Sequence, residues 1–68
     1  MKFLDLLSRL KPAEILELIV DGKTVLVGRA STTDWSKFVD YLVVAVMSEV
    51  TKETAYLQVI IMEPEKGE

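Results

Sequence analysis

The strongest constraint on the fold of this chain is an Asp-Gly pair, Asp21-Gly22, between two apolar stretches rich in β-branched residues. An Asp-Gly pair suits a two-residue type I′ turn, because both central positions of that turn need a positive φ. We therefore predict a β-hairpin over residues 14–29, with one strand on each side of the turn.

A two-residue loop also predicts the register of this hairpin and the composition of its two faces. Val20 is expected opposite Lys23, and Glu14 opposite Arg29 as a charge pair. The face expected to point into the core holds Leu16, Leu18, Val20, Val25 and Val27. The other face holds Ile15, Glu17, Ile19, Thr24 and Leu26. The second face is therefore mixed, whereas antiparallel sheets commonly have one polar face.

Two segments have the spacing of an amphipathic helix. In residues 2–10 the apolar side chains recur at i, i+3, i+4 and i+7, and Pro12 then disfavours helical geometry. Residues 33–40 show a similar spacing, and Ser31 and Asp34 near their start have the separation of a capping box. We predict one helix in each segment.

Residues 41–50 allow two interpretations. Their valines favour a strand, but their apolar residues also continue the helical period of the preceding segment. The strand is preferred, and residues 56–62 form a strand in either case. The predicted fold class is α+β, with the order α-β-β-α-β-β and a small antiparallel sheet whose helices pack on one face. The alternative is α-β-β-α-β with one long second helix.

Length and composition predict one small domain that depends on packing or association. The chain has 68 residues, of which 50% are hydrophobic, and it contains neither Cys nor His. Disulfides are therefore excluded, and we expect no metal and no cofactor, since zinc prefers Cys and His ligands. We assign residues 1–62 to a single domain and residues 63–68 to a disordered acidic tail. The net charge is −3, and about −1 without that tail.

Few residues could support catalysis. Without His or Cys, the only dense group of candidate side chains is Ser31, Thr32, Thr33 and Asp34. A helix cap explains these residue types at this place. We therefore expect no enzymatic activity, no catalytic residues and no small-molecule substrate.

The distribution of charge bears on location and on nucleic acid. Charged residues interrupt the N-terminal apolar run, and the longest apolar stretch, residues 41–47, is too short to cross a membrane. We expect a cytoplasmic protein without membrane contact. The nearly neutral body predicts no nucleic-acid partner. The alternative is a nucleic-acid-binding module that stacks bases on Tyr41 and Tyr56, with Lys37 and Lys52 nearby.

The clearest functional signal is the excess of apolar side chains, which exceeds what one covered sheet face can bury. An uncovered apolar face predicts association, and we expect a homo-oligomer, most simply a dimer, or a protein partner. Trp35 could cover the core or anchor such an interface. The residues expected at the interface are Ile15, Ile19, Leu26, Trp35, Tyr56 and Ile60.

The residue pattern also resembles a group of known proteins. The segments that carry the likeness are Met1-Lys2-Phe3-Leu4-Asp5-Leu6-Leu7, Gly28-Arg29-Ala30-Ser31, the turn at Asp34, and Tyr56-Leu57-Gln58-Val59-Ile60. Together they resemble short uncharacterised proteins of Gram-positive phages and prophages. The resemblance implies a phage or mobile-element setting, in which the partner would be a host or phage protein.

Overall fold

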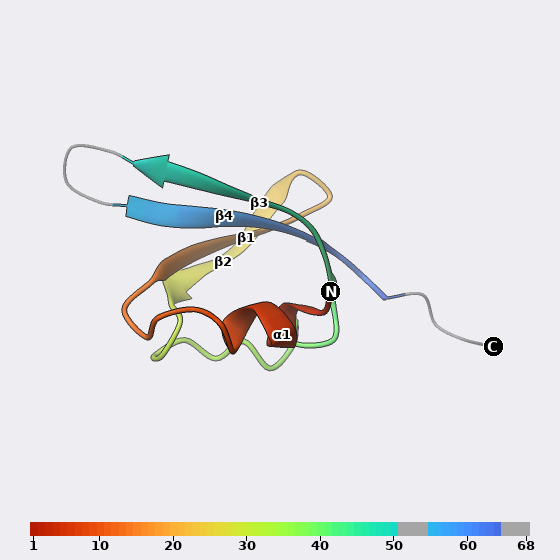
Figure 1. The fold of residues 1–68 in the computed structure, drawn as a ribbon. Coiled ribbons are helices and arrows are strands. Elements are labelled where there is room, and N and C mark those ends of the chain that lie inside the picture. The colour runs from red at the N-terminus through yellow and green to blue at the C-terminus, as the bar shows by residue number, and fades with distance from the viewer. Residues whose placement is uncertain (51–54, 65–68) are drawn as a thin grey trace.

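The computed structural model describes residues 1–50 and 55–64, which contain one short helix and four strands (Figure 1). The helix is α1 (Phe3–Leu7), and the strands are β1 (Ile15–Val20), β2 (Lys23–Arg29), β3 (Leu42–Val50) and β4 (Ala55–Met62). Figure 1 shows α1 and the segment 30–41 on one side of the sheet. Backbone bonds join them, since Phe3 N–H donates to the Tyr41 carbonyl (2.8 Å) and Leu4 N–H to that of Val39 (3.1 Å).

The four strands form one mixed sheet in the order β2-β1-β4-β3. β1 pairs with β2, and β3 with β4, in antiparallel fashion, but β1 and β4 are parallel, with Ile15 opposite Tyr56. The predicted all-antiparallel sheet is therefore wrong. The last strand lies in the middle of the sheet because it is strongly apolar, and a central position buries it beside β1.

The predicted turn at residues 21–22 is confirmed, but the predicted register of the hairpin is wrong. Asp21 and Gly22 have φ values of 52° and 77°, as a type I′ turn requires. Val20 lies opposite Lys23 as expected, whereas Arg29 lies opposite Ile15 instead of Glu14.

A β-bulge causes this change of register. The pairing shifts between Leu18 and Ile19, so that Leu18 lies opposite Leu26 and Ile19 lies opposite Thr24. One extra residue in β2 reverses the face of every later side chain of that strand. Leu26 therefore packs against the core, and Val27 points to the other side of the sheet.

The predicted second helix is wrong, because residues 33–40 form a series of turns. The Asp34 carboxylate accepts the backbone N–H of Ser36 (3.0 Å), two residues on, which is a turn contact instead of a helix cap. The indole N–H of Trp35 donates to the Ala30 carbonyl (3.1 Å), which holds the segment back against the end of β2.

The first helix is confirmed in place but is shorter than predicted. It ends at Leu7, and the N–H groups of Arg9 and Leu10 then donate to carbonyls three residues earlier. Its apolar side points at the core as the spacing predicts, and the residues concerned are Phe3, Leu6, Leu7 and Leu10.

The strand interpretation of residues 41–50 is confirmed, and the alternative with one long second helix is wrong. The strand is favoured because its valines lie along a pleated edge, where β-branched side chains pack well. Residues 65–68 of the predicted tail, and residues 51–54 between the two predicted strands, lie outside the described residues.

The core lies between the sheet and the layer made by α1 and the segment 30–41. Its buried members are Phe3, Leu16, Leu18, Trp35, Val59 and Ile61. The rings of Phe3 and Trp35 meet edge to face, with centroids 5.6 Å apart. This layer covers one face of the sheet only.

Candidate functional site

The candidate site is the face of the sheet that points away from α1, which we call the outer face. In strands, alternate side chains point to opposite faces, so this face carries the neighbours of the buried core residues. Its members include Ile15, Glu17, Ile19, Thr24, Val27, Arg29, Met47, Tyr56, Gln58 and Ile60. Two of its apolar members are well exposed. Val27 is 58% exposed and Met47 is 44% exposed.

A polar group lies in the middle of this face and joins three neighbouring strands. The Glu17 carboxylate on β1 accepts a hydrogen bond from the Thr24 hydroxyl on β2 and one from the Gln58 amide on β4 (3.1 Å). Both bonds favour the charged carboxylate, and that of Thr24 lowers the pKa of Glu17 most. We call these residues the Glu17 cluster. Each of the two carboxylate oxygens thus accepts one hydrogen bond from within the protein itself.

Four of the six residues predicted at an interface lie together on the outer face. Ile15 and Ile19 on β1 are half-buried, as are Tyr56 and Ile60 on β4. The parallel register places Ile15 opposite Tyr56 and Ile19 opposite Ile60, so these side chains form two adjacent pairs on the inner strands.

The other two predicted interface residues, Leu26 and Trp35, lie on the covered side. Leu26 packs against the core because the bulge turns it inward, and Trp35 is buried against Phe3. For Trp35 the structure thus agrees with the interpretation that it covers the core. Val27 and Met47 take part in the outer face instead. A bulge has no clear sequence signature here, and no pattern in the chain would have indicated Val27.

The group at residues 31–34 has a structural role in the turn. Asp34 accepts hydrogen bonds from Ser36, which lower the pKa of its carboxyl group. The backbone N–H of Thr33 donates to the Arg29 carbonyl (3.2 Å), and that of Ser31 donates to Pro12 (3.1 Å). These contacts tie the segment to its neighbours.

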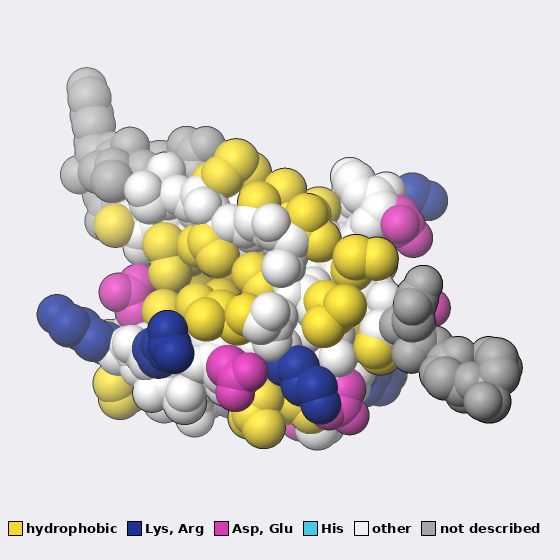
Figure 2. Space-filling model, turned by 45° about the vertical axis from the view of Figure 1, so that its right-hand side comes forward, with side chains coloured by type: hydrophobic (Ala, Val, Ile, Leu, Met, Phe, Trp, Pro, Cys, Tyr) yellow, Lys and Arg dark blue, Asp and Glu magenta, His cyan; other side chains and the backbone are white. Residues whose placement is uncertain are grey.

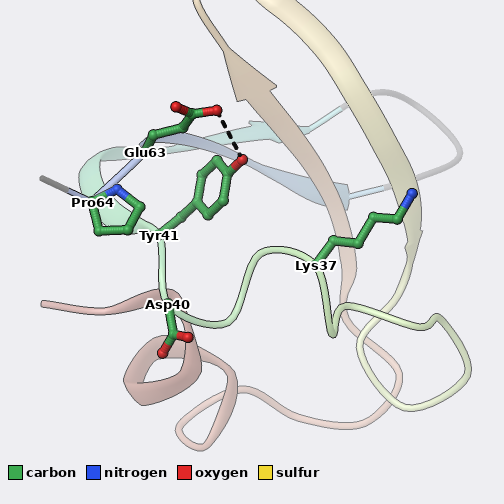
Figure 3. A pocket seen from close by; sticks show the side chains of 5 residues that line it. All are labelled: Lys37, Asp40, Tyr41, Glu63 and Pro64. Carbon is green, nitrogen blue, oxygen red and sulfur yellow. Dashed lines mark hydrogen bonds between the residues drawn. The ribbon is translucent and has the colours of Figure 1, made fainter. Parts of the chain in front are cut away.

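A shallow pocket lies at the start of β3, and it lacks converging groups. Figure 3 shows its lining residues, of which Tyr41 donates to the Glu63 carboxylate (3.4 Å). Burial and the Glu63 charge raise the pKa of Tyr41. In Figure 3 the side chains of Lys37 and Asp40 point away from Tyr41 and from each other. The arrangement offers no set of groups aimed at one ligand atom.

The two tyrosines of the nucleic-acid alternative lie on opposite sides of the sheet. Tyr41 packs against the core and against Phe38, with ring centroids 5.1 Å apart, whereas Tyr56 belongs to the outer face. Two rings separated by the sheet cannot form one stacking platform for successive bases. Lys52 lies outside the described residues.

Within residues 1–50 and 55–64, no three acidic side chains come together in a way that could hold a metal ion. The helix of this same part of the chain is too short to cross a membrane. Comparisons with protein families, with curated proteins and with solved structures found no match for this chain.

Proposed function

We propose that this protein is a non-enzymatic interaction module that binds a protein chain, either a second copy of itself or another protein, through its outer face. The observation that carries this proposal is a sheet with one covered face and one uncovered face, and the uncovered face exposes apolar side chains such as Val27 and Met47. Contiguous exposed apolar surface of this kind marks interaction sites in soluble proteins. Figure 2 shows how hydrophobic side chains gather across one side of the molecule, with charged side chains around them.

Hydrophobic contact is the expected driving force for this binding. Glu17 and Arg29, one of each sign, are the charged residues among the members named above, and a face with this pattern lacks the excess of basic residues that attracts nucleic acid. Its centre is the Glu17 cluster, whose satisfied hydrogen bonds suit an interface. A phage or prophage origin, with a host or phage protein as partner, and a cytoplasmic location belong to the same proposal and rest on the residue pattern.

The proposal predicts that a charge on the outer face abolishes association without unfolding the protein. Val27→Lys places an ammonium group on the most exposed apolar position of the face, where burial against a partner is strongly unfavourable. We expect the affinity for a second copy, or for a partner protein, to fall by at least about tenfold, equivalent to about 1.4 kcal/mol. The measurement is solution mass by light scattering across a wide concentration range, with thermal unfolding as a check on the fold.

Leu4→Lys is the matched control, because Leu4 is also an exposed apolar residue (53%) but lies on α1, on the covered side. It should leave association unchanged. If the wild-type protein is a monomer, a photo-crosslinking amino acid placed at position 27, and at position 4 as the control, tests for binding of another protein. We expect crosslinks from position 27 and none from position 4. Equal behaviour of the two positions in both experiments would exclude the outer face as the binding surface.

A further inference from the structure

A second surface of this protein, the free edge of β3, has the chemistry of a pairing site. β3 is the last strand of the sheet, so one side of its backbone does not face β4. The start of this edge is occupied, because Lys2 bridges Leu42 and Val43 N–H donates to the Met1 carbonyl (2.8 Å). In the part of the chain that the structure describes, no strand lies beside β3 beyond Val43. We call Val44–Ser48 the open edge.

The open edge lacks most of the features that keep sheet edges apart in other proteins. Such edges usually carry charged side chains, proline or β-bulges. β2, at the other end of the sheet, begins with Lys23 and ends with Arg29. Val44–Ser48 contains no charged residue and no proline, and it exposes Val44 (57%) and Val46 (44%). Two features limit this edge: a bulge at Val44, at the start of the segment, and Glu49, which follows Ser48 in the same strand.

We propose that the open edge pairs with the same segment of a second copy, antiparallel across a two-fold axis, and so joins two four-stranded sheets into one continuous sheet. The bonds to Met1 and Lys2 confine the pairing to residues beyond Val43. The described open edge is centred on Val46, which would therefore lie opposite its own counterpart, with Val44 opposite Ser48 of the second copy.

The charge pattern argues for a second copy as the occupant. A strand that pairs with itself places each charge near an identical charge, and like charges opposite each other are destabilising. The open edge carries none, and with Val46 on the axis the next charged residue of the strand, Glu49, would lie opposite Val43 of the second copy and not opposite its own counterpart. Two-fold pairing also produces a closed dimer, because each copy uses its open edge for one partner. Two-fold dimers are the commonest homo-oligomers. The other edge does not extend the assembly into a fibre, because Lys23 and Arg29 flank it.

This inference does not depend on the outer face. Val46 lies opposite Val59, on the covered side of the sheet, whereas Val27 points to the outer side. Substitutions at the two positions therefore separate pairing through the edge from contact through the face. If both surfaces are used, edge pairing makes the two outer faces neighbours in one longer sheet.

The test uses opposite charges at Val46 in the full chain. Val46→Glu and Val46→Lys each place two like charges across the proposed axis, so each variant alone should dimerise about fivefold more weakly, or worse. An equimolar mixture places unlike charges opposite each other and should restore the dimer. Sedimentation equilibrium to high protein concentration provides the measurement, because a short edge interface is expected to be weak. Val25→Glu, at an equally exposed valine of β2 (43%), is the matched control and should dimerise as wild type.

Several results would overturn the proposal: a wild-type protein that stays monomeric, a mixture that does not regain the dimer, or a dimer that Val27→Lys dissociates and Val46→Glu does not. The last result would refute edge pairing while supporting the outer face. A measurement without substitutions guards against variants that fail to fold. Hydrogen exchange of the wild-type amides at residues 44–48 should slow as protein concentration rises, and a rate independent of concentration would contradict the pairing.

Discussion

Gly28 on β2 has no side chain, and this allows the covering segment 30–41 to pack close to the sheet. Thr33 lies against its Cα, and a Cβ at position 28 would overlap the Thr33 hydroxyl and also approach Thr33 Cβ to 3.0 Å. The absence of a side chain on β2 thus lets the segment 30–41 lie close to the sheet. Because its φ is not in the left-handed region, the requirement is one of space.

We expect Gly28→Ala to lower the free energy of unfolding by about 1–3 kcal/mol, the range typical of overpacking. Urea denaturation measures this change. Thr33→Ala, which removes the hydroxyl and methyl groups, should recover part of the loss when combined with Gly28→Ala. A Gly28→Ala protein as stable as wild type would show that Thr33 does not pack on Gly28 as described.

The Glu17 cluster predicts a measurable titration. Its hydrogen bonds lower the pKa of Glu17, so they stabilise the folded protein above the ordinary pKa of a glutamate, and this stabilisation is lost as the pH falls through the lowered value. Thr24→Val removes the larger cause, and the pKa of Glu17 should then move back up towards its ordinary value. Carboxyl carbon shifts in an NMR titration report this directly. Thr32→Val, in an exposed turn, is the control, and equal Glu17 titrations in both variants would contradict the cluster.

At the scale of elements, the local signals of the sequence predict some features and fail for others for identifiable reasons. The turn at residues 21–22 depends only on the φ preference of two residues, and it is confirmed. The helix at 33–40 fails because Asp34 bonds to Ser36 and Trp35 bonds to Ala30, contacts that outweigh a short helical period. The sequence does not predict the bulge in β2, because the bulge depends on contacts with β1. For this reason the sequence predicts Leu26 on the wrong face.

The strand order makes a prediction about local stability. β1 and β4 have hydrogen-bonded neighbours on both sides and contain most of the buried core, whereas β2 and β3 each have one neighbour. Native-state hydrogen exchange at low protein concentration should therefore show the slowest amides in β1 and β4. Equal protection in all four strands, or the slowest exchange in β2, would contradict the order β2-β1-β4-β3.

For the whole molecule, composition indicates more about surface than about topology. The high hydrophobic content of a chain of 68 residues predicts more apolar side chains than one core can hold, and Ile15, Ile19, Tyr56 and Ile60 do lie on the uncovered face. The parallel pairing of β1 with β4 could not be predicted in this way. It joins residues about forty positions apart, such as Ile15 and Tyr56, and no local pattern of either segment specifies that neighbour.

The position of β4 also has a consequence for how the protein reaches its folded state during synthesis. Leu16 and Leu18 come from the second element of the chain, but the side chains that pack beside them, Val59 and Ile61, come from the last. A nascent chain that ends before β4 holds α1 and the first hairpin without two of the six buried core residues. Closing so long a loop is slow compared with forming a hairpin. The protein therefore completes its fold only after β4 has left the ribosome. Until then the apolar side chains of its earlier strands stay exposed, and chaperones can bind them.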